Sequence, residues 1–106
     1  MVGLAAITDL SLYAKGENSC QRSAARFMGT SPETDPQGYA KADPRQNKTP
    51  DNTVLLLGAA DTIVDEPQGR LDQARSNVVS DAGHFDFVHP HTPAFRIFVD
   101  ELEALL

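Results

Sequence analysis

The sequence has little or none of several features by which whole classes of protein are recognised. It contains one cysteine, Cys20, in 106 residues, so no internal disulfide can form and a reducing compartment is favoured. Fifteen acids outweigh nine bases, and no cluster of Lys or Arg alternates with aromatic residues, which argues against a nucleic-acid partner. No apolar run approaches the roughly 18 residues of a membrane span, and residues 1–7 lack the basic start of a signal peptide. We therefore expect a cytoplasmic protein whose partners include neither nucleic acid nor membrane.

The apolar segments that are present predict an α/β fold. Residues 54–57 form a continuous apolar run, which is too short for a helix and does not alternate, as expected of a parallel strand buried on both faces. Residues 2–7 and 77–79 are shorter or weaker segments of the same kind. We predict a single domain over residues 1–106, with a sheet of about three mostly parallel strands and helices packed on it.

Capping signals predict where the helices begin and end. Residues 20–28 follow an Asn-Ser cap and precede Gly29, a residue type that is common just past a helix end. A last helix over residues 94–105 follows Thr92 and Pro93, a cap and a first-turn proline. Two further helices are predicted: a short one that starts at Ser31 and Pro32, and a crossover helix over residues 65–75.

Three side chains in these helices carry expectations of their own. Phe27 is expected on the packed side of its helix, and Glu101 on the side that faces water. Cys20 has two interpretations, a substitute nucleophile in a small hydrolase or a small buried hydrophobic residue. No tight turn of the kind that presents a nucleophile surrounds Cys20, which favours the buried interpretation.

An Asp and a His follow two of the expected strands. Asp61 comes after the strand at residues 54–57, and His84 comes after the strand at residues 77–79. Because the carboxyl ends of parallel strands meet at one edge of a sheet, the two side chains are expected to lie close together. A carboxylate beside an imidazole fixes its tautomer and stabilises its protonated form, so the pair can serve as acid and base in nucleophilic catalysis.

The segments that hold these two residues resemble a known superfamily. GAADTIVDE, residues 58–66, and DAGHFDF, residues 81–87, are similar to the carboxyl-terminal third of α/β-hydrolases of the esterase, lipase and formamidase-like branches. The resemblance implies that Asp61 is the acid of a catalytic triad and His84 its base. We expect no cofactor. It also implies that residues 10–50 are a cap-like insertion.

The sequence departs from that superfamily at the nucleophile. The family's serine sits in Gly-x-Ser-x-Gly, and none of the seven glycines here brackets a serine with that spacing. By the family's order of triad residues, the nucleophile and the oxyanion hole belong upstream of Met1. We therefore expect a truncated fragment of a serine ester or amide hydrolase that is inactive alone.

A different class of function is suggested by the strand expected from Val2 to Ile7. This strand carries no charge, and an apolar sheet edge is normally covered, because it can pair with another chain. A second copy of the chain would cover it in a homodimer or higher oligomer, unless residues 10–50 fold back over it. The alternative to a hydrolase fragment is therefore a non-catalytic binding or self-assembly module with a hydrolase-derived fold.

The histidine-rich segment at residues 84–91 could instead bind a metal ion. His84, Asp86, His89 and His91 fall within eight positions, and all are possible metal ligands. Pro90 and the lack of a helical pair of ligands argue against a site, so we predict none. Asp86 is expected instead to hydrogen-bond the loop behind His84.

Overall fold

A computed structural model describes all residues from Met1 to Leu106. The chain divides into two compact units. The first, here called the sheet unit, comprises Met1–Ala6 and Thr49–Leu106. The second, here called the insertion unit, comprises Ile7–Lys48.

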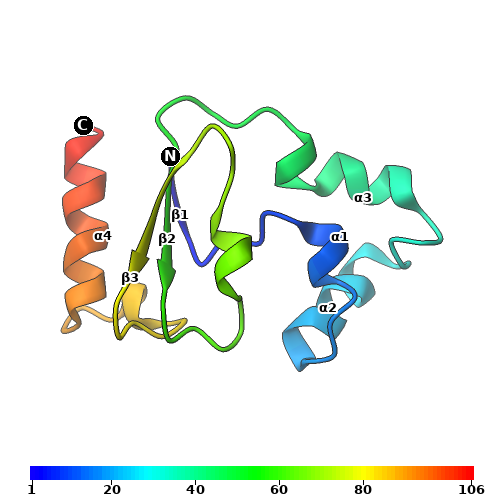
Figure 1. Ribbon diagram of the computed structural model, residues 1–106, viewed down its shortest axis with the longest axis horizontal. Coiled ribbons are helices and arrows are strands. Elements are labelled where there is room, and N and C mark those ends of the chain that lie inside the picture. The colour runs from blue at the N-terminus through cyan, green and yellow to red at the C-terminus, as the bar shows by residue number, and fades with distance from the viewer. The chain divides into compact units, whose positions relative to one another are not determined.

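The sheet unit contains three parallel strands. They are β1 (Val2–Leu4), β2 (Val54–Gly58) and β3 (Arg75–Val79), with β2 in the centre. β2 is paired parallel with both β1 and β3, and the arrows of β2 and β3 in Figure 1 point the same way, so the carboxyl ends of the strands share one edge. The predicted α/β class, with a sheet of three parallel strands and helices, is confirmed.

The central strand is buried along its whole length, as its unbroken apolar run predicted. Val54 and Leu56 belong to one core cluster with residues of α4 (Pro93–Ala104). Successive side chains of a strand point to opposite faces, and Leu57 accordingly packs on Gly69, in the 3₁₀ turn η2 (Glu66–Gly69). Both faces of β2 are therefore covered within the sheet unit.

The predicted crossover helix over residues 65–75 is wrong. That segment contains only η2, and β3 begins at Arg75, whose backbone N–H donates to the carbonyl of Thr53 at 3.0 Å. A side chain at Gly69 would place its Cβ 2.9 Å from Leu57 Cδ2, so the close packing there requires glycine. Glycine also disfavours a helix by about 1 kcal/mol relative to alanine. Packing against β2 thus holds this segment in a tight turn.

The last helix, α4, begins where the capping signal predicted. The Thr92 hydroxyl accepts a hydrogen bond from the Phe95 N–H at 3.1 Å, and Pro93 occupies the first turn. The prediction for Glu101 is wrong, because its side chain is only 14% exposed and is paired with Arg75 of β3. One of the two hydrogen bonds in this pair, from Arg75 Nη1 to Glu101 Oε1, measures 2.8 Å.

The insertion unit holds three short helices and a 3₁₀ turn. They are α1 (Leu10–Tyr13), α2 (Ser19–Met28), α3 (Pro36–Ala42) and η1 (Pro44–Gln46). The predicted ends of α2 are confirmed, because Asn18 and Gln21 form a capping box and Gly29 closes the helix with φ of +75°. None of the helices is both long enough and apolar enough to cross a lipid bilayer.

Two local predictions for the insertion unit are wrong. Ser31 begins a single turn rather than a helix, because its hydroxyl accepts from the Thr34 N–H and bonds the Thr34 hydroxyl. The helix starts later, where the Asp35 side chain accepts from the Gly38 N–H at 3.0 Å. Phe27 does not pack inward, since it is 90% exposed on α2.

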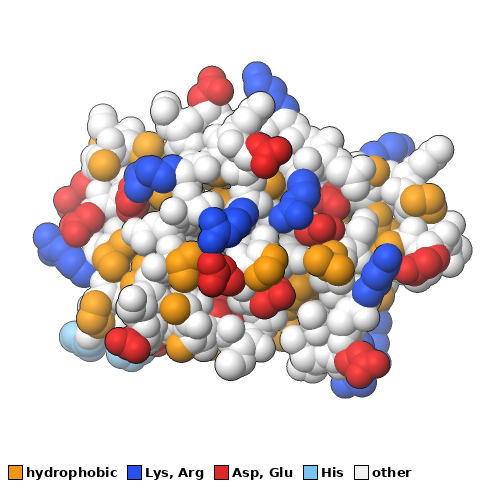
Figure 2. All heavy atoms as spheres, viewed as in Figure 1, with side chains coloured by type: hydrophobic (Ala, Val, Ile, Leu, Met, Phe, Trp, Pro, Cys, Tyr) orange, Lys and Arg blue, Asp and Glu red, His pale blue; other side chains and the backbone are white.

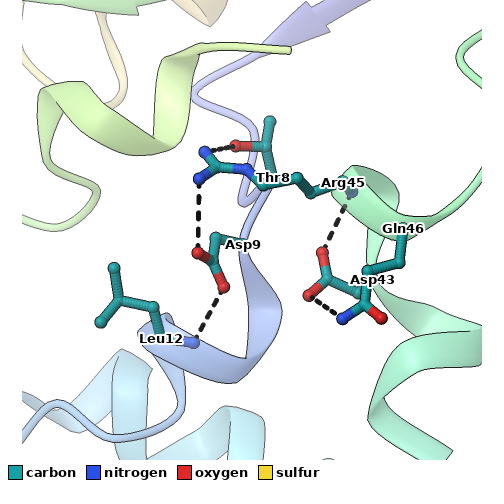
Figure 3. A network of polar contacts seen from close by, with 6 residues as sticks. All are labelled: Thr8, Asp9, Leu12, Asp43, Arg45 and Gln46. Atoms are coloured by element: carbon teal, nitrogen blue, oxygen red, sulfur yellow. Dashed lines mark hydrogen bonds and ion pairs between the residues drawn. The ribbon is translucent and has the colours of Figure 1, made fainter. Parts of the chain in front are cut away.

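A polar network joins the beginning and the end of the insertion unit (Figure 3). The Arg45 guanidinium contacts the Asp9 carboxylate at 3.4 Å and the Thr8 hydroxyl at 3.2 Å. The buried Asp43 side chain accepts from the Arg45 N–H at 3.0 Å and from the Gln46 amide at 3.4 Å. Segments more than thirty positions apart in the sequence are thereby held together.

Candidate active site

Asp61 lies on the loop that follows β2. Gly58 ends the strand where the chain passes against the loop that follows β3, and a Cβ at Gly58 would lie 2.1 Å from the Ala82 carbonyl oxygen. Only glycine fits so close an approach. Backbone hydrogen bonds from Ala59 to Val79 and from Ala60 to Ala82 then join the two loops. The close contact at Gly58 therefore sets the distance between the loops that carry Asp61 and His84.

The Asp61 carboxylate is fully buried, and its two oxygens have different partners. Oδ1 accepts hydrogen bonds from the backbone N–H groups of Ile63 at 2.8 Å and Val64 at 2.9 Å. Oδ2 lies 2.8 Å from Nδ1 of His84. The first pair of bonds fixes the rotation of the carboxylate, so the second oxygen is aimed at the imidazole.

His84 is held on the loop that follows β3. The Asp86 carboxylate accepts from the Gly83 N–H at 2.8 Å, which confirms the predicted role of Asp86 behind the histidine. The hydroxyl of Thr92, the cap of α4, donates to the Asp86 carbonyl at 2.5 Å and so ties this loop to the helix. The Phe85 ring packs edge-to-face on the imidazole, with ring centroids 4.8 Å apart.

The opposite nitrogen of the imidazole, Nε2, is open to solvent. No other hydrogen bond to His84 is made besides the one at Nδ1, and no buried side-chain nitrogen or oxygen lacks a partner. Nε2 therefore cannot be buried, in agreement with a His84 side chain that is 23% exposed. With Nδ1 donating to the carboxylate, Nε2 carries the lone pair that a general base uses.

The other candidate residues do not join this pair. No group of three or more His, Cys, Asp or Glu side chains is arranged to hold a metal ion, so the alternative metal site has no support in the geometry. The rings of His89 and His91 lie 6.1 Å apart on the surface. Cys20 is exposed on α2, in the insertion unit, so the expectation of a buried cysteine is wrong.

A cavity of about 320 Å³ lies elsewhere in the sheet unit. Its lining includes Thr53, Val54 and Arg75, at the amino ends of β2 and β3. The Asp61–His84 pair lies beyond the carboxyl ends of the same strands. Sequence reasoning did not find this cavity, because its lining residues follow no motif and meet only through the register of β2 and β3.

Comparisons of this chain with protein-family models, with curated proteins and with solved structures found no match.

Proposed function

We propose that this chain supplies the acid and the base of a serine ester or amide hydrolase of the α/β-hydrolase type. Asp61 is the acid and His84 the base. The observation that carries the assignment is the 2.8 Å contact between a buried carboxylate oxygen and Nδ1 of a partly exposed imidazole. The two residues lie at the carboxyl ends of neighbouring parallel strands, where open α/β sheets place their sites.

In such a hydrolase the Asp61–His84 pair accepts a proton and then donates it, once in each of the two half-reactions. Nε2 of His84 accepts the hydroxyl proton of a nucleophilic serine as the serine oxygen attacks the substrate carbonyl. The buried carboxylate of Asp61 stabilises the imidazolium formed in this step. The imidazolium then gives the proton to the leaving alcohol or amine, and a water molecule repeats the sequence to release the acyl group.

Acyl transfer by this route requires two parts that the 106 residues do not contribute. No Ser, Thr or Cys side chain hydrogen-bonds Nε2, and no Gly-x-Ser-x-Gly elbow is present. The nucleophile and the oxyanion hole are therefore assigned to another polypeptide segment. The chain alone is expected to hydrolyse a p-nitrophenyl ester no faster than the same concentration of free imidazole, because enzymatic acyl transfer needs the nucleophile and the oxyanion hole.

The pairing itself can be tested on the chain alone by ¹⁵N NMR of the histidine rings. The neutral ring of His84 is expected to carry its proton on Nδ1, because the Asp61 carboxylate is acceptor-only. Asp61→Asn should lose this preference, while the surface residues His89 and His91 keep their spectra. A wild-type His84 ring protonated mainly on Nε2 would contradict the assignment.

The catalytic assignment needs a nucleophile to be supplied. A hydrolase half that contains a Gly-x-Ser-x-Gly elbow, fused ahead of this chain, is expected to restore ester hydrolysis. Removing the base of such a triad costs several orders of magnitude in turnover. A fused enzyme that stayed fully active after His84→Ala would defeat the assignment, and His89→Ala is the matched control.

Self-assembly is a second candidate function, and the outer edge of β1, which pairs with no other strand of the sheet, favours it. Met1 and Ala5 bond β2 through the Met1 carbonyl and the Ala5 N–H, at 2.9 and 2.8 Å. Backbone groups of alternate residues point to opposite sides of a strand, so Val2 and Leu4 direct theirs to the outer edge. The β1 strand of a second copy could pair antiparallel with this edge, with the Gly3 residues of the two copies opposite each other. Because glycine has no side chain, no side-chain clash arises at that position.

Light scattering tests this second candidate. At micromolar concentration the chain should have the mass of a dimer, and Leu4→Pro should give a monomer because it removes one outward N–H. Leu4→Val keeps that donor and should stay dimeric. A wild-type monomer would remove the candidate.

A further inference from the structure

We infer that the substrate at His84 is an ester or amide that carries no negative charge and places an apolar group beside Phe85. This inference deepens the proposed function and rests on it. It is carried by two observations on the sheet unit, the distribution of its charges and the apolar side chains next to the base.

The sheet unit holds most of the negative charge of the chain. It contains ten acids, three arginines and no lysine, a net charge of −7, whereas the insertion unit has a net charge of +1. Figure 2 shows histidine side chains beside an acidic one in the corner where Figure 1 shows the loop leading into α4. A surface of one sign attracts or repels charged molecules before they bind, and so changes the rate at which they arrive.

Each arginine of the sheet unit is already paired with a carboxylate. Arg70 contacts Glu66 at 2.7 Å, and Arg96 contacts Asp100 at 3.1 Å. Arg75, the third, is paired with Glu101 of α4. An anionic substrate would therefore find no lysine and no unpaired arginine in this unit to bind its charge.

The loops that hold the catalytic pair add further carboxylates. Asp65 follows Asp61 on the first loop, and Asp81 precedes His84 on the second, and both are exposed. The Asp86 carboxylate, bonded to the Gly83 N–H, lies on the second loop as well. Carboxylates on the two loops that carry Asp61 and His84 disfavour a carboxylate or phosphate group at the site, and this effect weakens as salt shortens the screening length below about 10 Å.

Apolar surface is available immediately beside the base. Phe85 is 68% exposed although its ring packs edge-to-face on His84, and Val88 is 62% exposed at the end of the next turn, η3 (Asp86–Val88). An apolar acyl, aryl or alkyl group would cover this surface on binding, with a gain of roughly 25 cal/mol per Å² buried. The side chains of Phe85 and Val88 provide no hydrogen-bonding or charged group that could bind a charged substituent.

The charge preference can be measured on the chain as it exists with a matched pair of alkylating reagents, bromoacetamide and bromoacetate. Each reacts by attack of the Nε2 lone pair on the CH₂ carbon, with loss of bromide, and the two differ by one negative charge. Tandem mass spectrometry that separates alkylation at His84 from alkylation at His89 and His91 gives both rates. Rates for N-acetylhistidine methylamide, which has no carboxylate, give the intrinsic ratio.

At low salt, the ratio of the bromoacetate rate to the bromoacetamide rate at His84 is expected to be about three- to tenfold below that of N-acetylhistidine methylamide, as electrostatic steering predicts. The difference should shrink in 0.5 M salt, which screens exposed charges. The double variant Asp65→Asn/Asp81→Asn should raise the ratio. Asp51→Asn/Asp72→Asn removes two exposed charges that precede β2 and β3, and should raise it less.

The outcomes separate this inference from the proposed function. If His84 reacts with neither reagent, Nε2 is not an accessible base and the proposed function fails. If His84 reacts readily but with the ratio of N-acetylhistidine methylamide, the charge preference alone is overturned. If the two double variants raised the ratio equally, the charge preference would also be overturned, because the carboxylates on the loops around His84 would then have no special effect on the rate.

Discussion

At the scale of single residues, Gly58 decides whether the two loops of the candidate site can meet. A Cβ there would lie 2.1 Å from the Ala82 carbonyl oxygen, so Gly58→Ala must push the loops apart. We expect a loss of about 1–3 kcal/mol in the free energy of unfolding, as for other overpacked sites, and loss of the Nδ1-protonated signal of His84. Urea unfolding and ¹⁵N NMR measure the two effects. Gly29→Ala is the control: its φ of +75° strains alanine, so stability falls while the signal stays. A Gly58→Ala protein with an unchanged signal would contradict this account.

Some residues of the candidate site could be predicted from the sequence, and others could not. Asp61 and His84 were predictable because each follows an apolar strand and the strand ends of a parallel sheet converge. The two backbone N–H groups on Oδ1 of Asp61 were not predictable, because they depend on the path of the loop. The exposure of Phe85 was also hidden, since an aromatic residue beside an apolar segment resembles a core residue in any sequence pattern.

At the scale of secondary-structure elements, the pair formed by Arg75 and Glu101 joins β3 to α4. The Arg75 hydrogen bonds and charge hold the pKa of Glu101 below its ordinary 4.5, although burial opposes this. A depressed folded-state pKa stabilises the fold above about pH 4.5, and this stabilisation is lost as pH falls through the folded-state value. Glu101→Gln should therefore lower the urea midpoint at pH 7, with a smaller difference from wild type as pH falls below 4.5. The exposed Glu103, altered to Gln, is the control, and a difference independent of pH would refute the prediction.

The bounds of a secondary-structure element could be predicted from the sequence where nearby side chains determine them. They could not be predicted where packing against a distant segment determines them. The ends of α2 and the start of α4 depend on side chains within a few positions, such as Asn18, Gly29 and Thr92. The segment at residues 65–75 has acids and a proline that suit a helix start, yet contact between Gly69 and Leu57 keeps it a turn. The pairing of Glu101 with Arg75 likewise depends on the register of α4 against β3, which the helical period of the sequence does not contain.

At the scale of the whole molecule, the division into two units predicts that the insertion unit can lose stability by itself. Asp43 is buried there, and its carboxylate accepts the Arg45 N–H and the Gln46 amide. Asp43→Ala leaves these donors without their acceptor, which costs about 1–3 kcal/mol, or roughly 5- to 150-fold in local opening. Native-state hydrogen exchange should therefore show lower protection of backbone amides in α3, and unchanged protection in β2. Asp43→Asn keeps one acceptor oxygen and should restore part of the protection. If amides of β2 lost as much protection as those of α3, the two units would unfold as one cooperative body, and the sheet that positions Asp61 and His84 would depend on the insertion.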